Sequence, residues 1–162
     1  MRWTAEQAYE RLAPAVRGYF RGRGAHDPDD LTGDVFVNVT RGLASFDGDA
    51  DALRRWVFTI AHHRMVDEYR RASNDRHIWM ADVPDAAHDA AQDATAAGDD
   101  DLTHALALLG DDQREVVVLR FVADLALKDV ARIVGKRQGA VKMLQARGLE
   151  RLNELLNIED RP

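Results

Sequence analysis

The sequence predicts an all-α protein of two small helical domains joined by a flexible acidic linker. Apolar residues recur at spacings of three and four in both ends of the chain, and no stretch alternates with the period of two that a strand requires. Between these ends, residues 81–112 carry nine Asp and no Lys or Arg. Residues 1–80 are neutral and residues 113–162 are basic, so the net charge of -6 does not argue against a nucleic-acid partner.

Two helix starts in the N-terminal part have clear capping signals. The first helix is expected over residues 4–19, where Thr4 and Gln7 have the spacing of a capping box. The second begins in "HDPDDL", with Asp27 as the N-cap and Pro28 at the first helical position.

The third helix is expected over residues 51–72 and follows the loop "SFDGDAD". Its sequence, "LRRWVFTIAHHRMVDEYRR", is rich in arginine and also carries an apolar side. Trp56 lies beside Val57 and in register with Ile60, so we expect it to pack in the core rather than to stack on a base.

The segment "ADVPDAAHDAAQDATAAGDDD" has too few large apolar residues to bury a core, and we expect it to be a mobile linker. It divides the chain into predicted domains at residues 1–75 and 100–162, with the linker at 76–99. The C-terminal domain is predicted to contain four helices, at about 100–109, 112–122, 127–134 and 138–156.

The last two predicted helices have the spacing of a helix-turn-helix. Ala131 is the small residue where the helices meet, Gly135 suits a turn with positive φ, and Val141 locks the second helix against the first. The other inward positions are Val130, Val134 and Leu144. An ordinary helical hairpin with a solvated face would show similar spacing.

The stretch "GKRQGAVKMLQARG" contains four basic residues and no carboxylate, although the whole chain is acidic. A recognition helix lies against DNA phosphates, where a carboxylate would be repelled. We expect Arg and Gln side chains to reach base edges and Lys to meet phosphate. The predicted exposed contacts are Lys136, Arg137, Gln138, Lys142, Gln145 and Arg147.

The composition excludes several other classes of protein. The absence of cysteine rules out disulfides, Cys-ligated zinc and thiol catalysis. No apolar stretch is long enough to span a membrane, and charged residues interrupt the first eleven positions, so no signal peptide is expected. We therefore expect a soluble, cytoplasmic protein without membrane insertion.

Two blocks of the sequence together resemble one known family. "ALALLGDDQREVVVLRFVADLALKDVARIVGKRQGAVKMLQARGLERL" resembles the domain of bacterial RNA polymerase sigma factors that binds the −35 promoter element. "DPDDLTGDVFVNVTRGLASFDGDADALRRWVFTIAHHRMVDEYRR" resembles their −10-binding domain. With only these two domains and a short linker, the chain resembles the extracytoplasmic-function (ECF) group. The resemblance makes residues 1–75 region 2 and residues 100–162 region 4.

This resemblance implies a set of roles for region 2. A face of the second helix would dock on the β′ clamp helices of core polymerase, through Asp30, Leu31, Asp34 and Phe36. The following loop would capture a flipped −10 base, through Ser45, Phe46, Asp47, Gly48 and Asp49. The basic helix would contact −10 DNA through Arg54, Arg55, His62, His63, Arg64, Arg70 and Arg71.

The implied partners are core polymerase, including its β flap, promoter DNA and a possible anti-sigma factor. The sequence departs from the family pattern in places. Gly33 stands where the family has Gln, His62 and His63 replace the usual Arg and Asn, and Leu144 replaces a frequent Arg. We expect these departures to alter polymerase contacts and promoter preference.

Three other interpretations remain at this point. A helix-turn-helix regulator that acts alone on DNA would explain the C-terminal block but not "DPDDLTGDVF". A degenerate sigma factor that binds polymerase without opening promoters would fit both blocks. A metalloenzyme could use His63 and Asp67, which are spaced i, i+4 on a helix, but no third ligand has a useful spacing. We expect no enzymatic activity, metal or cofactor.

Overall fold

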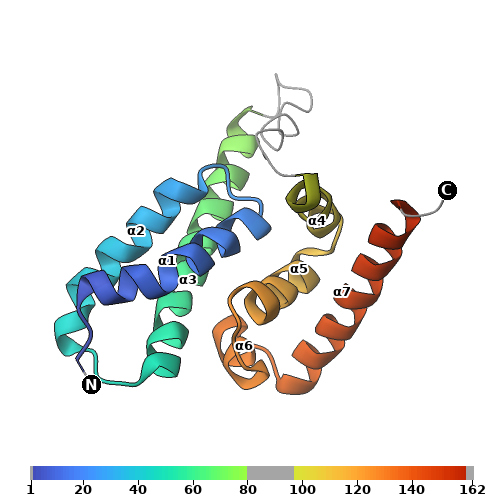
Figure 1. Cartoon of the computed structure of the whole chain (residues 1–162). Coiled ribbons are helices and arrows are strands. Elements are labelled where there is room, and N and C mark those ends of the chain that lie inside the picture. Colours follow the sequence, from blue (N-terminus) through green and yellow to red (C-terminus); the bar gives the residue numbers. More distant parts are fainter. Residues whose placement is uncertain (1, 80–96, 160–162) are drawn as a thin grey trace.

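The computed structural model describes residues 2–79 and 97–159, with side chains for residues 2–74 and 101–157. Every regular element in these ranges is helical, which confirms the predicted fold class. The N-terminal helices lie on one side of the molecule and the C-terminal helices on the other (Figure 1).

The N-terminal part contains α1 (Ala5–Gly22), α2 (Pro28–Gly42), the short 3₁₀ turn η1 (Leu43–Ser45) and α3 (Ala50–Trp79). Both predicted caps are confirmed. The Gln7 amide donates to the Thr4 hydroxyl over 3.1 Å, and the Thr4 amide donates to the Gln7 side chain over 3.0 Å. The Asp27 carboxylate accepts from the Asp30 amide over 3.1 Å, which satisfies a free donor in the first turn of α2.

The ends of α3 and α4 differ from the predicted linker boundaries. α3 continues to Trp79, beyond the predicted end at residue 72. α4 (Ala97–Ala107) begins before residue 100. Both ends of the predicted linker at 76–99 are therefore helical, and its central part, 80–96, lies outside the described residues. α4 carries three consecutive Asp residues close to its first residue, where the helix dipole favours negative charge.

The C-terminal part continues with α5 (Asp111–Val117), the π-helical turn η3 (Val118–Val122), α6 (Leu127–Val134) and α7 (Gln138–Glu159). The single helix predicted at 112–122 therefore changes its hydrogen-bonding pattern halfway. α6 has its predicted ends, and Gly135 closes it at φ 70° and ψ 33°, the left-handed conformation predicted for this turn.

The buried apolar side chains of both parts form one connected core. Tyr19, Phe20 and Phe58 come from the N-terminal part and are fully buried. Val118 and Leu119 come from the C-terminal part and are also fully buried. α1 contacts α2 and α3 on one side and α4 and η3 on the other. The two predicted domains thus pack directly against each other.

Candidate promoter and polymerase interfaces

The α6–α7 pair has the internal packing that a helix-turn-helix needs. Val130 and Val141 are fully buried, and Ala131 is almost so. Val134 and Leu144 are half-buried against the same core. The Lys136 amide donates to the Ala131 carbonyl over 3.0 Å, which completes the cap of α6 at the turn. Val141 therefore anchors the first turn of α7 in the core, while Lys136, Arg137 and Gln138 stay exposed.

Five of the six predicted −35 contacts are exposed, four at or near the start of α7 and Arg147 farther along it: Lys136, Arg137, Gln138, Lys142 and Arg147. The prediction that Gln145 is exposed is wrong. It is half-buried, and its Oε1 is buried without a partner among the described residues. Gln145 follows Val141 by one helical turn, so it lies on the side of α7 that faces the core.

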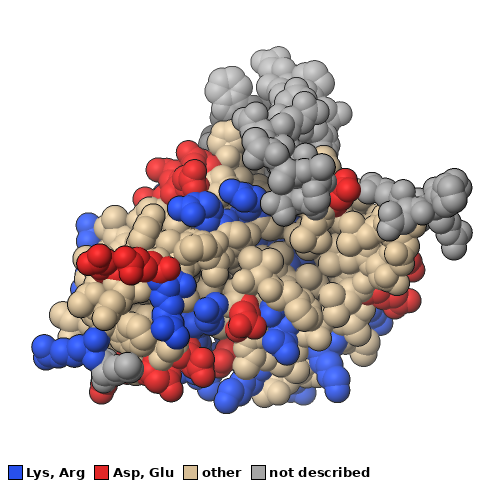
Figure 2. All heavy atoms as spheres, in the orientation of Figure 1, with Lys and Arg blue, Asp and Glu red and all other residues tan. Residues whose placement is uncertain are grey.

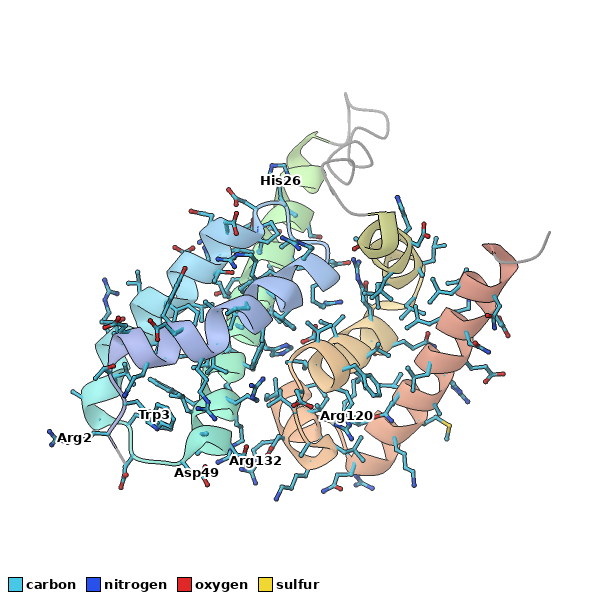
Figure 3. The ribbon with its side chains drawn as sticks, viewed as in Figure 1. Arg2, Trp3, His26, Asp49, Arg120 and Arg132 are labelled. Carbon is cyan, nitrogen blue, oxygen red and sulfur yellow. The ribbon has the colours of Figure 1, made fainter. Side chains whose placement is uncertain are left out.

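The loop before α3 is held by contacts that the sequence did not reveal. The Trp3 indole donates to the Gly48 carbonyl over 2.9 Å. Phe46 stacks on Trp56 with 4.8 Å between ring centroids and 13° between planes. Asp49 accepts from the Ala52 amide and caps α3. Figure 3 shows Trp3 and Asp49 at the same end of the molecule.

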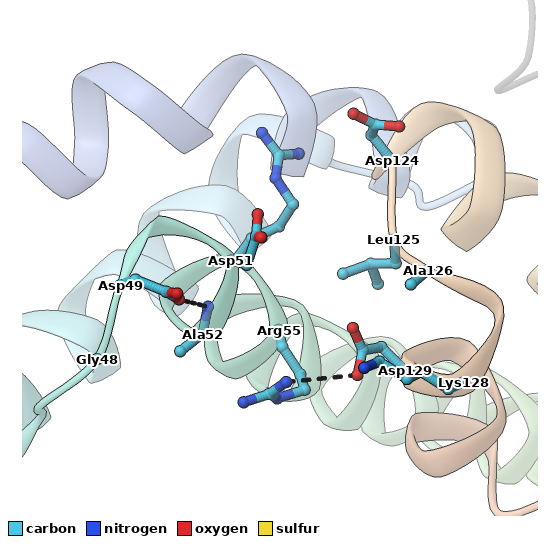
Figure 4. Close-up of a pocket in the computed structure, with 11 residues that line it drawn as sticks. Gly48, Asp49, Asp51, Ala52, Arg55, Asp124, Leu125, Ala126, Lys128 and Asp129 are labelled. Carbon is cyan, nitrogen blue, oxygen red and sulfur yellow. Dashed lines mark hydrogen bonds and ion pairs between the residues drawn. The ribbon is translucent and has the colours of Figure 1, made fainter.

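Trp56 is half-buried and packs against the core, as expected, but its ring also supports this loop. A cleft of about 680 Å³ opens beside the loop (Figure 4). Gly48 and Asp49 line one side, and Leu125 and Lys128 line the other. The cleft therefore lies between the predicted base-capture loop and the start of α6.

The seven basic residues predicted to bind −10 DNA are not equally available. His63, Arg70 and Arg71 are exposed, while Arg54, Arg55, His62 and Arg64 are half-buried. Arg64 is the one of these four that pairs within its own half. Its Nη2 lies 2.8 Å from Asp34, a residue predicted to bind polymerase.

The other three half-buried residues contact the C-terminal part. The Nη1 of Arg54 donates to the Ala123 carbonyl over 2.7 Å. The Nη1 of Arg55 lies 3.4 Å from a carboxylate oxygen of Asp129, as drawn in Figure 4. The Nδ1 of His62 lies 2.6 Å from a carboxylate oxygen of Glu115.

The predicted polymerase-binding face of α2 needs correction. Leu31 is 3% exposed and Phe36 is 7% exposed, so both belong to the core and cannot form a docking surface in this conformation. Phe36 packs edge-on against Tyr9, with 5.1 Å between ring centroids. Asp30 is exposed and Asp34 is half-buried, and Val37 is an exposed apolar residue that the sequence analysis did not select.

A buried ionic cluster centred on Glu115 is the main feature that sequence reasoning missed. The Tyr19 hydroxyl donates to a Glu115 carboxylate oxygen over 2.9 Å, and Arg23 forms an ion pair with the other oxygen. Glu115 precedes the buried Leu119 by one helical turn, which was the available signal that it lies on the inner side of α5.

The cluster changes the proton affinity of two neighbours. Burial, followed by the charge of Glu115, raises the pKa of Tyr19 well above its usual value of 10.0. Burial, followed by the charge of Arg23, lowers the pKa of Arg114 to about 10. Tyr19 therefore stays neutral and Arg114 stays charged near neutral pH.

The visible surface has no broad basic patch. Figure 2 shows Lys and Arg intermixed with Asp and Glu on this face. Within the described residues, no group of three or more His, Cys, Asp or Glu could hold a metal ion. Among those same residues, no helix is both long enough and apolar enough to cross a membrane.

Comparisons with known proteins agree with this arrangement. The family model described as "Sigma-70 region 2" matches residues 8–74, and "Sigma-70, region 4" matches residues 105–154. The chain belongs to the sigma-70 family. The region 2 match does not support the interpretation as a lone helix-turn-helix regulator.

Curated relatives are ECF RNA polymerase sigma factors. BldN of Streptomyces coelicolor is 28% identical over 142 residues, which cover 85% of this chain and 54% of BldN. SigD of Mycobacterium tuberculosis is 28% identical over 158 residues, which cover 91% of this chain and 74% of SigD. The chain thus spans about half the length of BldN and three quarters of SigD.

A solved structure shows the same fold over nearly the whole chain. It is the sigma factor RpoE of Bartonella quintana in complex with the anti-sigma factor NepR. The TM-score is 0.77 at 25% identity, and the alignment covers 96% of this chain and 98% of RpoE. In that relative, the helices of both parts are therefore arranged much as they are in this chain.

Proposed function

We propose that this sigma factor binds core RNA polymerase, recognises −35 and −10 promoter elements, and promotes melting of the −10 region. The observation that carries the proposal is the start of α7, where exposed basic side chains and no carboxylate follow a rigid left-handed turn. This is the geometry that places a recognition helix in the major groove. The adjoining region 2 fold supplies the second promoter contact.

The −35 contacts are proposed to be Lys136, Arg137, Gln138, Lys142 and Arg147. Their exposure supports this assignment, and the half-buried Gln145, whose Oε1 is buried, is left out. Arg137 and Gln138 stand at the beginning of α7, where a recognition helix reaches base edges, while the lysines suit phosphates.

The −10 contacts are proposed to be the exposed His63, Arg70 and Arg71, together with the loop that ends at Asp49. The support for the loop is its fixed shape, because Trp3 and Trp56 hold its backbone and its Phe46 ring. A preformed pocket lowers the cost of capturing an extruded base. The roles of Arg54, Arg55 and His62 depend on their release from the C-terminal part.

The polymerase-docking face is proposed to consist of Asp30, Gly33, Asp34 and Val37 on α2. The other three follow Asp30 by three, four and seven positions, so all four share one side of the helix. The exposure of Val37 supports an apolar contact flanked by carboxylates, which suits a partner with basic and apolar side chains. Leu31 and Phe36 would support this face from below.

We extend the proposal to regulation, location and catalysis. The Bartonella quintana relative was solved with an anti-sigma factor, which supports an anti-sigma partner for this chain as well. A protein that acts on promoter DNA must be located where that DNA is, which in a bacterium is the cytoplasm. The phosphoryl transfer would belong to the polymerase, and this chain would contribute no catalytic group.

The test is multi-round transcription with bacterial core polymerase on a fragmented genomic template, with and without the protein. We expect new transcript starts that depend on the protein, and their alignment would reveal the two promoter elements. Co-elution with core but no new transcripts would indicate a degenerate sigma factor. Neither transcripts nor co-elution would refute the proposed function.

A further inference from the structure

The two halves of the molecule approach each other very closely at α1. A Cβ atom added to Gly18 would lie 3.1 Å from a Val122 methyl group, and one added to Gly22 would lie 3.1 Å from Val118. Glycine at both positions lets η3 pack directly against the backbone of α1. Neither position requires a positive φ, so close packing is the physical reason for glycine here.

One carboxylate joins three elements across this contact. Glu115 is on α5, Tyr19 and Arg23 are at the end of α1, and His62 is on α3. The Glu115 side chain is 8% exposed, and every hydrogen bond or ion pair given above for it reaches the N-terminal half. A buried charge that loses its partners is strongly destabilising, so these interactions form or break together.

Two arginines add hydrogen bonds across the contact, one from each half of the molecule. Arg114 on α5 donates from Nε to the Gly22 carbonyl over 2.7 Å, at the end of α1. Arg54 on α3 donates to the Ala123 carbonyl over 2.7 Å, just after η3. Each satisfies a carbonyl at a helix end, and each belongs to the opposite half.

We propose that the Glu115 cluster is an intramolecular latch that closes region 4 over the DNA-binding side of region 2. In the closed state, three residues predicted to bind −10 DNA instead contact the C-terminal half: Arg54 contacts Ala123, Arg55 contacts Asp129 and His62 contacts Glu115. These contacts engage Nη1 of Arg54 and of Arg55 and hold both side chains against the C-terminal half, so a DNA phosphate would have to compete with them. The inference that closure masks DNA-binding residues rests on the proposed function, whereas the existence of the latch does not.

The chemistry of the interface suits a contact that opens. Glu115, Arg23 and Arg114 would regain hydration on exposure to water, which offsets part of the lost interaction. Interfaces between domains that move are typically more polar than permanent ones. The closed and open states are then two discrete packings, and a partner that binds only the open state shifts the population toward it.

The free protein provides the first test. The chain has no cysteine, so Glu6→Cys in α1 and Ala146→Cys in α7 give two unique, exposed label positions, one in each half. Pulsed electron paramagnetic resonance between spin labels at these sites measures the separation of the halves. We expect a single narrow distance distribution for the otherwise native sequence, and a broad distribution would overturn the proposal.

Two variants open the latch by independent routes. Glu115→Gln keeps the size of the side chain but leaves Arg23 as an unpaired buried charge, and Gly18→Leu drives a side chain against Val122. For each, we expect at least about a tenfold larger fraction of long distances. The matched control is Glu154→Gln, which removes a carboxylate paired with Arg151 inside α7 and should leave the distances unchanged.

Far-UV circular dichroism verifies that each variant remains helical. If Glu115→Gln loses its helices, Gly18→Leu decides the question, because it substitutes no residue of the ionic cluster. Unchanged distances in the folded variants would overturn the latch.

Masking is tested with a fluorescent 30-nucleotide single strand of mixed sequence at low salt. We expect Glu115→Gln to bind it about tenfold more tightly than the native protein, because freed arginines reach phosphates. Adding Arg54→Ala and Arg55→Ala to Glu115→Gln should remove this gain. Equal affinity of the open and native proteins would overturn masking.

Adding core polymerase to the spin-labelled native protein distinguishes a failure of the latch hypothesis from a failure of the proposed function. Binding with a shift to long distances supports both. Binding without a shift would overturn the latch as a barrier to function. Failure to bind polymerase would refute the proposed function, while the distances in the free protein would still decide whether the latch exists.

Discussion

Replacing Gly33 by alanine should stabilise the protein. Gly33 lies in the interior of α2, is exposed, and has nothing within 4 Å of the position that a Cβ would occupy. The substitution therefore adds helix propensity without a clash, and glycine is about 0.8–1.0 kcal/mol less favourable than alanine in a helix interior. For a chain of 162 residues, this corresponds to a rise in Tm of about 2–4 °C.

Gly148→Ala is the matched control for this reasoning. It is the same substitution, also within a helix, but its Cβ would lie 2.7 Å from a Val117 methyl group. Overpacking of a core costs about 1–3 kcal/mol, which cancels or exceeds the gain in propensity. Urea denaturation monitored by circular dichroism gives both free energies of unfolding. If the free energy of unfolding changes in the same direction and by the same amount in both variants, helix propensity and packing do not explain the difference between these two positions.

The same position connects stability to polymerase binding. Gly33→Gln restores the residue that the family pattern has there, and the open space above α2 accommodates it. We expect its stability to be similar to that of Gly33→Ala, because the two residues have similar propensities. Tighter binding of Gly33→Gln than Gly33→Ala to core polymerase would place this side of α2 at the interface. Equal affinities would contradict that placement.

Three further predictions follow from particular residues. Gly135→Ala should destabilise the protein by about 1–2 kcal/mol, measured by urea denaturation, because an L residue is strained at φ 70°. Tyr19 has a raised pKa in the folded protein, so its contribution to stability is complete below pH 10 and is lost at higher pH. The difference in free energy of unfolding between the native protein and Tyr19→Phe should therefore shrink above pH 10. A difference that stays constant with pH would contradict this. Arg137→Ala should weaken promoter binding by the holoenzyme and reduce its salt dependence, whereas Arg151→Ala, which removes a paired arginine farther along α7, should do neither in the same titration.

Local signals in the sequence were reliable guides to helix starts and to the helix-turn-helix. Thr4, Asp27 and Pro28 act through neighbours three or fewer positions away, so their roles are visible without the fold. Gly135 is similar, because its left-handed conformation depends on the turn itself. The resemblance to sigma factors was also carried by contiguous blocks, and both family regions were confirmed.

The features that sequence reasoning missed depend on distant contacts. Glu115 looks like a surface residue in the sequence, and only the approach of α1 and α3 turns it into the centre of a buried cluster. Leu31 and Phe36 were assigned to a docking face because their motif carries that role in the family, but their burial is set by the packing of α2 on its neighbours. Gln145 is a similar case. Its polar side chain suggests an exposed position, but it lies one helical turn after the buried Val141 and therefore faces the core.

The indole of Trp3 gives the first residues of the chain an influence on a segment that begins more than 40 positions later. Trp3 is fastened twice, by its bond to the Gly48 carbonyl and by the Arg11 guanidinium 5.6 Å from its ring. A truncation at Thr4, or a fused tag that pulls Trp3 away, would therefore remove one of the contacts that hold the loop, without altering any side chain proposed to contact DNA. Under the proposed base-capture role of this loop, strand opening would then depend on the contacts of Trp3.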